Sequence, residues 1–295
     1  MITTSATYRS RTSTEPSPVD RVEPVIWGDP TGGPLTRDES TAYERDGLLV
    51  FEQLLDDGEV DRLGKDLQHL TRDPRLDGDD RVIREPDGRA VRSVFEVHRL
   101  SDAVADLATD PRLLDRAEQI LGSAAHLHQT RVNFKPGFRG REFYWHSDFE
   151  TWHMEDGMPQ MRAVSVSVNL TPNLDCNGSL MIVPASHRTF VGCAGATPDE
   201  HFRASLRQQE YGTPSDEALA RLVEAGGITQ IQAPAGSAVF FDSNCMHGSN
   251  GNITPYPRNN VFLVYNSVEN ALVEPFGGTT PRPSYIAARE VHPLG

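Results

Sequence analysis

Helical periodicity dominates the first third of the chain. The stretch DDGEVDRLGKDLQHLTRD, residues 56–73, places apolar side chains three and four positions apart, which predicts a helix with one buried face. DPRLLDRAEQILG, residues 110–122, predicts a second helix with Asp110 as its N-cap, Pro111 in its first turn and Gly122 just beyond its end. TRDESTAYERDG, residues 36–47, predicts a shorter helix entered through Thr36 or Asp38, and LLVFEQLL follows it as a short strand.

Extended patterns replace the helical ones after Gly122. RVIREPDGRAVRSVFEVH, residues 81–98, already predicts a hairpin around Pro86, Asp87 and Gly88. HLHQTRVNFKP, AVSVSVNL, SLMIVP, ITQIQAP, SAVFFD and NNVFLVYNSV then follow as short strands, and a polar insert at residues 195–227 is expected to be partly helical. Helices followed by many short strands predict a mainly β fold, an antiparallel sandwich or barrel with flanking helices.

One predicted strand carries an unusually polar face. Gln129, Arg131, Asn133 and Lys135 alternate with His128, Thr130, Val132 and Phe134. The polar face could simply be directed to water, or it could line a ligand cavity inside a barrel. The alternation alone does not decide between these two arrangements.

Composition and charge limit the organisation and the partners of the protein. Residues 1–30 are rich in Ser and Thr, which predicts a flexible N-terminal tail followed by a single domain over residues 31–295. The net charge of −14 disfavours nucleic acid and anionic membranes as partners, and no apolar run reaches the roughly 18 residues of a membrane helix. The three cysteines, Cys176, Cys193 and Cys245, form no CxxC pair, which favours reduced thiols in a cytoplasmic protein.

The stretch WHSDFETWHMEDGMPQMR, residues 145–162, holds the strongest metal-binding pattern. Its His146 and Asp148 form an H-x-D pair, and positions i and i+2 of a strand point to the same side. SAVFFDSNCMHGSN adds His247 after a strand and a turn. Two imidazoles and one carboxylate are the ligand set of non-haem Fe(II) oxygenases. Other histidines compete for such a role, namely His153, His187 and the H-x-H pair His126 and His128.

Arg258 follows His247 by eleven residues and gives the pattern a second component. A guanidinium near an iron site suits a dicarboxylate cosubstrate such as 2-oxoglutarate, because it binds a carboxylate through two parallel hydrogen bonds. The keto acid end of the cosubstrate would then bind the metal, and its far carboxylate would lie on Arg258.

These motifs resemble those of the phytanoyl-CoA dioxygenase superfamily of Fe(II)- and 2-oxoglutarate-dependent oxygenases. NGSLMIVPASH and PAGSAVFFDSNCMHGSN are similar to its recurring segments. FYWHSDFETWHMEDGMPQMRAVSVS resembles the signature of the ectoine hydroxylase family within it, and RSVFEVH and HQTRVNFK are also similar to that family. The resemblance extends from about Thr36 to the C-terminus.

The resemblance implies a double-stranded β-helix, also called a jelly roll or cupin-like fold, and a homodimer. It implies hydroxylation of ectoine to 5-hydroxyectoine with Fe(II), 2-oxoglutarate and O2, releasing succinate and CO2. Iron would be held by His146, Asp148 and His247. The 2-oxoglutarate contacts would be Arg258, Asn133, Lys135, Phe143, Ser165 and Ser249, and the ectoine contacts would be Gln129, Thr151, Trp152, Phe262 and Arg282.

The chemistry of ectoine agrees with part of this assignment, and two alternatives stay open. Arg282 suits the carboxylate of ectoine, and the face of Trp152 suits its delocalised cationic ring. A hydroxylase of the same superfamily could instead act on another small amino-acid-like metabolite. A non-catalytic jelly-roll metal-binding protein would need the metal ligands but not Arg258. His153 and Glu155 could shape the loop around Trp152 or support the metal ligands.

Overall fold

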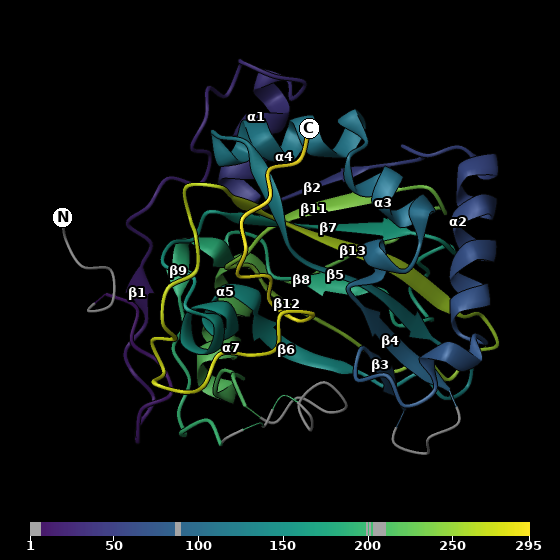
Figure 1. The fold of residues 1–295 in the computed structure, drawn as a ribbon. Helices are drawn as coiled ribbons and strands as arrows, with labels where there is room; N and C mark the ends of the chain where they lie inside the picture. The colour runs from purple at the N-terminus through teal and green to yellow at the C-terminus, as the bar shows by residue number, and fades with distance from the viewer. Residues whose placement is uncertain (1–6, 86–89, 199, 201, 203–210) are drawn as a thin grey trace.

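The fold is built on two antiparallel β-sheets with helices outside the larger one (Figure 1). The computed structural model describes residues 7–85, 90–198, 200, 202 and 211–295. The large sheet has the strand order β2-β11-β7-β13-β5-β4-β3, and the small sheet has the order β10-β8-β12-β6. This two-sheet arrangement is the double-stranded β-helix that the sequence predicts.

The strands of the large sheet are β2 (Leu48–Phe51), β3 (Val82–Arg84), β4 (Val91–Phe95), β5 (Ala125–Lys135), β7 (Ala163–Asn169), β11 (Ala238–Asp242) and β13 (Arg258–Ser267). Those of the small sheet are β6 (Phe143–Ser147), β8 (Leu180–Ile182), β10 (Thr229–Gln230) and β12 (Met246–Ser249). A separate pair joins β1 (Val19–Asp20) to β9 (Thr189–Phe190). The helices are α1 (Arg37–Asp46), α2 (Asp57–Leu70), α3 (Asp102–Ala108), α4 (Pro111–Leu121), α5 (Asp148–Thr151) and α7 (Asp216–Gly226), with a π-helical turn at Trp152–Asp156 and 3₁₀ turns at Pro74–Leu76, Val97–Arg99 and Ser186–Arg188.

α1 and α4 begin and end at the residues that the sequence predicts. Thr36 and Glu39 form a reciprocal capping box at the start of α1. Asp110 caps α4, and Gly122 ends it with a φ of +64°. These caps satisfy the backbone groups that a helix end leaves unpaired, so the boundaries follow from local sequence. Of the predicted hairpin, β3 and β4 are present and paired, while its turn at residues 86–88 lies outside the described residues.

The large sheet has an apolar outer face and a polar inner face. In β7, Val164, Val166 and Val168 belong to the apolar core formed with α1 to α4. The alternate residues Ser165 and Ser167 point the other way and are also buried. On β5, Gln129, Asn133 and Lys135 are only 5%, 3% and 1% exposed. The polar strand face predicted from the sequence is therefore buried between the two sheets, and the reading in which it is directed to water is excluded.

The N-terminal segment differs from the flexible tail expected from its composition. From residue 7 onward it runs along the protein past β9 (Figure 1). Tyr8 is 1% exposed, and its ring lies 5.0 Å from that of Phe190. Arg21 pairs with Asp242 at 2.7 Å. Ser and Thr content indicates how little a segment packs against itself, but it contains no information about partners far along the chain.

The C-terminal coil covers the part of β5 that β4 leaves unpaired. The backbone N–H of Ala288 donates to the carbonyl of His128 at 2.8 Å, and that of Leu294 donates to Ala125 at 2.9 Å. β4 pairs only with the far half of β5, from Arg131 to Asn133. The coil thus protects an edge of the large sheet that would otherwise be open to another strand.

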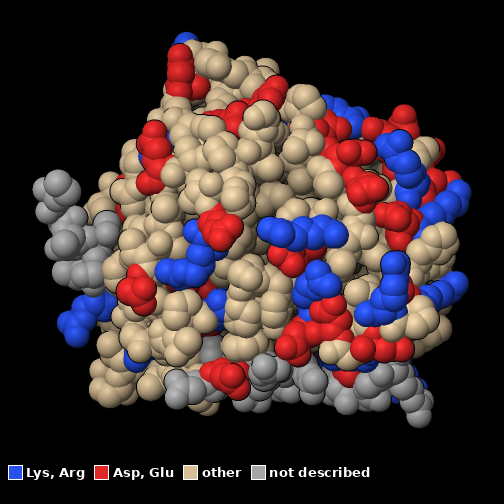
Figure 2. Space-filling model, in the orientation of Figure 1, with Lys and Arg blue, Asp and Glu red and all other residues tan. Residues whose placement is uncertain are grey.

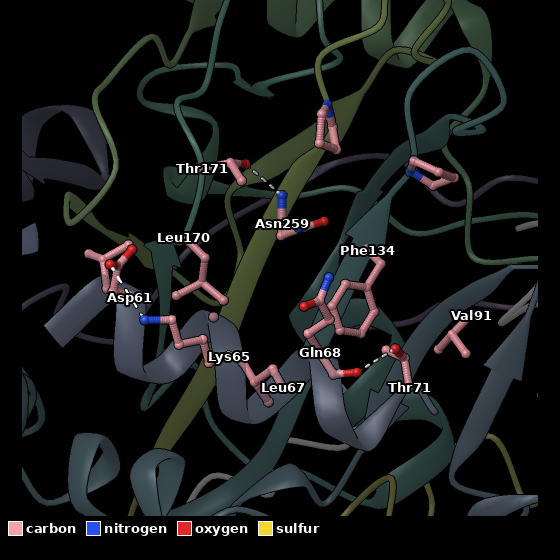
Figure 3. A pocket seen from close by; sticks show the side chains of 14 residues that line it. Asp61, Lys65, Leu67, Gln68, Thr71, Val91, Phe134, Leu170, Thr171 and Asn259 are labelled. Carbon is pink, nitrogen blue, oxygen red and sulfur yellow. Dashed lines mark hydrogen bonds and ion pairs between the residues drawn. The ribbon is translucent and has the colours of Figure 1, made fainter. Parts of the chain in front are cut away.

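The surface carries charges of both signs. On the face drawn in Figure 2, basic side chains lie among acidic ones rather than in a patch of one sign. Along the described ranges, none of the helices has the length and apolarity to cross a membrane. A groove of 460 Å³ runs between α2 and the ends of the large-sheet strands, lined by Lys65, Gln68, Phe134, Leu170 and Asn259 among others (Figure 3).

Candidate metal centre and its surroundings

His146, Asp148 and His247 converge at one end of the small sheet. His146 in β6 and His247 in β12 are directly paired partners in neighbouring antiparallel strands. Asp148 is the first residue of α5, directly after β6, rather than a strand residue. The prediction that His146 and Asp148 point to the same side of one strand is therefore wrong, because the strand ends at Ser147. The helix start, capped by Ser147, turns Asp148 toward the two histidines instead.

The geometry of these three side chains suits a metal ion. Asp148 Oδ1 lies 3.8 Å from His146 Nε2, and Asp148 Oδ2 lies 3.9 Å from His247 Nε2. The Nδ1 of His146 lies 2.7 Å from the carbonyl of Tyr144, and the Nδ1 of His247 lies 3.0 Å from that of Cys245. A carbonyl only accepts, so both Nδ1 atoms donate and both Nε2 atoms keep a lone pair for a metal. Two nitrogens and one carboxylate fit iron(II) with open positions left for other ligands.

The electrostatics keep the three groups in their metal-binding protonation states. Burial, and then the neighbouring His247, lower the pKa of His146 to about 3. Burial alone would raise the pKa of Asp148, but the two imidazoles and Arg131 lower it below its ordinary value. Ser165 Oγ also donates to Asp148 Oδ2 at 3.1 Å. At neutral pH the centre therefore presents a neutral His146 and an ionised carboxylate.

The competing histidines lie elsewhere. In the part of the chain that the structure describes, one cluster of His, Cys, Asp and Glu has metal-binding geometry, and it is His146, Asp148 and His247. His153 bonds the carbonyl of Met158 through Nδ1 and stacks on Phe276, with ring centroids 4.0 Å apart. It therefore shapes the loop around Trp152, which is one of the two roles expected for it. His187 lies 3.2 Å from the carbonyl of Glu44, through its Nε2.

A cluster of buried cations lies beside the metal centre. Arg258 at the start of β13 pairs in register with Lys135 of β5, and the two side chains are 2% and 1% exposed. The Nζ of Lys135 donates to Ser249 Oγ at 2.7 Å, two residues along β12 from His247. Arg92 of β4 lies over the ring of Phe143 at 3.9 Å. Ser249 in turn pairs with Phe143, so the ladder that carries the metal histidines also contacts this cluster from the small sheet.

This cluster has more positive charge than its protein neighbours offset. Glu85 lies 3.4 Å from Arg92, but the guanidinium of Arg258 bonds only the carbonyl of Gly178, at 2.6 Å, and its Nε has no hydrogen-bond partner among the described residues. Burial, together with Arg258 and Arg92, lowers the pKa of Lys135 to about 5. Burial and Arg92 lower the pKa of Arg258 to about 10. Buried cations without counterions are costly, so the site favours an anionic ligand.

Asn133 lies on β5 two residues before Lys135, between β4 and β13. Its Oδ1 accepts from Ser93 Oγ at 2.7 Å, and it pairs in register with Asn260. Its amide nitrogen faces the same inter-sheet space as Lys135, because the two residues are on one strand face. This position is compatible with the expected contact between Asn133 and 2-oxoglutarate.

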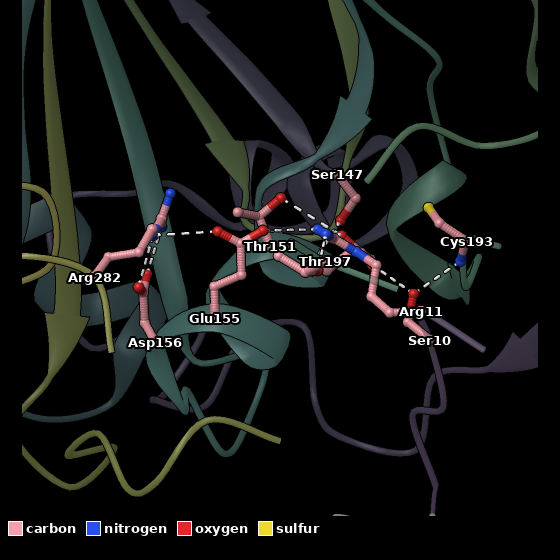
Figure 4. A network of polar contacts seen from close by, with 10 residues as sticks. Ser10, Arg11, Ser147, Thr151, Glu155, Asp156, Cys193, Thr197 and Arg282 are labelled. Atoms are coloured by element: carbon pink, nitrogen blue, oxygen red, sulfur yellow. Dashed lines mark hydrogen bonds and ion pairs between the residues drawn. The ribbon is translucent and has the colours of Figure 1, made fainter. Parts of the chain in front are cut away.

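The residues expected to bind ectoine gather around the π-helical turn. Trp152 is 3% exposed, and its ring meets that of His128 edge-on at 5.0 Å. Arg282 forms a two-bonded pair with Asp156 at 2.8 and 2.6 Å (Figure 4). A cavity of 220 Å³ is lined by Arg282 and Glu155. Thr151 precedes Trp152 in the same segment, half-buried.

Gln129 and Phe262 lie on the large sheet, and Phe262 packs with Leu180 and Ile182 of the small sheet rather than with Trp152. Both contact a residue that the sequence analysis did not select as a site residue. The Nε2 of Gln129 donates to the carbonyl of Ile286 at 2.7 Å. Arg131 donates to Gln129 Oε1 at 3.1 Å and lies over the ring of Phe262 at 5.1 Å. Arg131 shares the polar strand face with Gln129 and Asn133, and this alternation was the available signal. Arg92 was missed too, although a charged residue inside an apolar strand pattern marks it.

Comparison with known proteins gives one consistent result. The family model of phytanoyl-CoA dioxygenase matches residues 43–260. The chain is 54% identical over 288 residues to the ectoine dioxygenase of Nocardia farcinica, covering 97% of this chain and 95% of that one. It is 52% identical over 295 residues to the ectoine dioxygenase of Streptomyces avermitilis, with both chains covered completely.

Solved structures give the same result. The crystal structure of EctD from S. alaskensis with 2-oxoglutarate and 5-hydroxyectoine matches with a TM-score of 0.88 and 44% identity, covering 97% of this chain and 96% of that one. The structure of the same protein with bound Fe matches with a TM-score of 0.86 and 42% identity, with the same coverage. A non-haem α-ketoglutarate-dependent epimerase from nogalamycin biosynthesis, at 23% identity and a TM-score of 0.54, shares the fold alone.

Proposed function

The chain belongs to the phytanoyl-CoA dioxygenase family and, within it, to the ectoine dioxygenases, and from this premise we propose how its residues divide the reaction among them. The protein is an Fe(II)- and 2-oxoglutarate-dependent dioxygenase that hydroxylates ectoine to 5-hydroxyectoine and releases succinate and CO2. The observation that carries this conclusion at the level of residues is the convergence of His146, Asp148 and His247 beside an excess of buried positive charge.

His146, Asp148 and His247 would hold the iron. When bound, iron and 2-oxoglutarate activate O2 and supply the oxidant that converts a ring C–H bond of ectoine to C–OH. Asp148 supplies the anionic ligand, and its carboxylate is oriented by Ser165. Ser165 is also one of the residues expected to contact 2-oxoglutarate, so it would serve both the metal ligand Asp148 and the cosubstrate.

Arg258 and Lys135 bind the far carboxylate of 2-oxoglutarate in this assignment. Their burial and mutual repulsion leave a site that gains stability when an anion enters. Phe143 and Ser249 form the wall beside Lys135, and Asn133 lies on the same strand face as Lys135. The keto acid end is then directed toward the metal ligands on the same β6–β12 ladder.

Trp152, Gln129, Thr151, Phe262 and Arg282 bind and orient ectoine in this assignment. Arg282 already has two of its nitrogens on Asp156, so it offers the remaining Nη1 to the carboxylate of ectoine. The face of Trp152 receives the cationic ring. These groups also close the site against water, which matters because an oxidant that meets no C–H bond reacts unproductively.

The deciding experiment reconstitutes the protein with Fe(II) without oxygen, then adds O2, 2-oxoglutarate and ectoine. Succinate and 5-hydroxyectoine are expected in equal amounts, and His146→Ala or Asp148→Ala should abolish both. Succinate without 5-hydroxyectoine would keep the oxygenase and reject the substrate. If the protein is shown to hold iron but forms neither product, the result would favour a non-catalytic metal-binding protein.

We further propose that the protein acts in the cytoplasm as a homodimer. The family resemblance supports the dimer, and the unpaired state of Cys176, Cys193 and Cys245 is compatible with a reducing compartment. Light scattering coupled to size exclusion measures the mass in solution, and 32.6 kDa instead of twice that value would reject the dimer.

A further inference from the structure

We propose that Arg11 is a positioning residue that holds the segment from Asp148 to Asp156 in the conformation that binds ectoine. The inference rests on the proposed function, because this segment contains Asp148, Thr151 and Trp152. Arg11 belongs to the N-terminal segment and lies outside the part of the chain in which the family motifs were found. The Arg11 side chain does not bond the residues expected to hold iron or ectoine. It acts through the carboxylates of Glu150 and Glu155 in the same segment.

The contacts of Arg11 reach both ends of the segment. Its Nε and Nη2 donate to the two carboxylate oxygens of Glu150 at 2.6 and 2.8 Å, and Nη2 also lies 3.0 Å from Glu155 Oε1 (Figure 4). Nη1 donates to Thr197 at 2.6 Å. Glu150 lies two residues after Asp148, and Glu155 lies three residues after Trp152. One guanidinium thus connects the start of α5 to the end of the π-helical turn.

The charges in this network explain why an arginine is needed. The side chains of Glu150, Glu155 and Asp156 are 1%, 3% and 0% exposed, so none of them is stabilised by water. Two guanidiniums share them: Arg11 serves Glu150 and Glu155, while Arg282 bonds Asp156 and lies 3.6 Å from Glu155. Loss of Arg11 would remove one of the two guanidiniums beside Glu155. The charge of Glu155 would then act more strongly on Arg282 and would draw it away from Asp156 and from the position expected to bind the ectoine carboxylate.

Hydrogen bonds hold the backbone of Arg11 in one conformation, and this directs its guanidinium toward Glu150 and Glu155. Arg11 has a φ of +58°, a left-handed conformation that is uncommon for a residue with a side chain. Its N–H donates to the carbonyl of Cys193 at 2.8 Å, and the N–H of Cys193 donates back to Ser10 Oγ at 2.8 Å. Ser10 also donates to Glu150. The ring of Tyr8 lies edge-on to Phe149, 5.6 Å away, and so anchors the same segment.

The segment itself has little regular structure to hold its shape. α5 is a single turn, and the π-helical turn follows it directly. Short π-helical turns are weakly stabilised by their own hydrogen bonds and are kept by the surrounding protein. The position of Trp152 relative to Asp148 therefore depends on the contacts that enclose the segment, and Arg11 and Arg282 provide charged ones.

Arg11→Met and Arg11→Lys test this proposal against the matched control Arg21→Met. Arg21 belongs to the same N-terminal segment, and its side chain is equally buried at 3% exposed. Its guanidinium bonds Asp242 and the carbonyls of Pro24 and Met161, all outside residues 148–156. The measurements are the anaerobic Kd for ectoine of the protein loaded with Fe(II) and 2-oxoglutarate, and the ratio of succinate to 5-hydroxyectoine during turnover.

Arg11→Met should raise the Kd for ectoine about tenfold or more and form more succinate than 5-hydroxyectoine, with the Kd for 2-oxoglutarate changed less than about twofold. Arg11→Lys keeps the charge but loses the two-bonded geometry, so its Kd should lie between those of Arg11→Met and the wild type. Arg21→Met should keep the wild-type Kd and product ratio even where its melting temperature falls.

A further variant separates stability from positioning. Arg11→Met combined with Glu150→Gln removes one of the two buried carboxylates that lose Arg11, so the double variant should regain part of the melting temperature but not the ectoine affinity. Wild-type Kd and product ratio in both Arg11→Lys and the double variant would overturn the positioning role. If the wild-type protein forms no 5-hydroxyectoine, the proposed function is overturned instead. If the wild type is active and the Arg11 variants behave like it, only the inference about Arg11 is overturned.

Discussion

Asp148 is the side chain on which most contacts of the metal centre converge. Both histidine Nε2 atoms face its carboxylate, and Ser165 donates to the oxygen nearer His247. The hydrogen bond restricts rotation of the carboxylate, because a donor on one oxygen fixes where the other oxygen points. We therefore expect Ser165 to contribute to metal affinity by orienting Asp148, without being a ligand itself.

Replacement of Ser165 by Ala should weaken Fe(II) binding about 10- to 100-fold, in the range found when partners of metal ligands are removed. Anaerobic titration of Fe(II) in the absence of 2-oxoglutarate measures this directly. Ser167→Ala is the matched control, since Ser167 is equally buried on the same face of β7 but bonds Asn260. An iron affinity unchanged in Ser165→Ala would mean that Asp148 is held by the helix start alone.

Lys135 should take up a proton when 2-oxoglutarate binds. Its pKa of about 5 in the ligand-free protein means that it is neutral at pH 7, and a carboxylate beside it favours the ammonium form. Calorimetry at pH 7 in buffers of different ionisation enthalpy should report uptake approaching one proton per 2-oxoglutarate, and affinity should fall as pH rises above about 5. Lys135→Met should bind more weakly and show less proton uptake. Binding without any proton uptake would place the carboxylate away from Lys135.

At the residue scale, the sequence predicted which side chains come together at the candidate metal centre, but not the secondary structure that positions Asp148. The metal ligands and Arg258 could be selected because their residue types and spacing are specific. The helical position of Asp148 could not, because the H-x-D pair spans a strand end where the period of two no longer holds. Arg11 could not be found at all, because its partner Glu150 is 139 positions away and no local pattern relates them.

Two glycines show how far local rules determine the elements. Gly64 lies inside α2 with open space where a Cβ would be, whereas Gly122 ends α4 at a φ of +64° and a Cβ there would lie 2.6 Å from the backbone of Trp27. Gly64→Ala should stabilise the protein by about 0.5–1 kcal/mol, because alanine is the better helix former. Gly122→Ala should destabilise it by about 1–3 kcal/mol. Urea unfolding measures both, and equal effects would contradict this distinction.

Elements with complete local signals could be predicted, and elements held by distant contacts could not. α1 and α4 carry their own caps, and β5 and β7 carry unbroken alternation, so the sequence identified all four. The π-helical turn at Trp152–Asp156 has no sequence pattern of its own, because it is maintained by ion pairs and ring contacts from both ends of the chain. The same reason explains why residues 7–30 differ from the expected tail.

At the scale of the whole molecule, buried histidines should make stability fall in mild acid. Burial, and then Arg99, lower the pKa of His98 to about 4, and burial, and then His128, lower that of His126 to about 4. Between an ordinary pKa of about 6.5 and about 4, the unfolded chain binds protons that the folded protein does not. These two groups therefore contribute stability that is present above about pH 6.5 and is lost as pH falls toward 4.

Urea unfolding of the metal-free protein at several pH values in this window tests the expectation. His126→Phe should show a shallower loss of unfolding free energy between about pH 6.5 and pH 4 than the wild type, since one of the groups is gone. His69→Phe is the control, because His69 is exposed on α2 and is not among the groups that shift the pKa of His126. Parallel pH profiles for wild type and His126→Phe would show that His126 titrates normally in the folded protein.

The ligands of the metal centre come from two distant parts of the chain, and this separation sets an order in time. Synthesis proceeds from the N-terminus at roughly 5–20 residues per second, so Arg11 waits on the order of ten seconds for Glu150, 139 positions later. His146 and Asp148 leave the ribosome next, still without His247, and Arg282 follows last. No growing chain can therefore hold iron with all three ligands until β12 has been made. Iron is therefore expected to be bound by all three ligands only after β12 has left the ribosome, late in synthesis or after it.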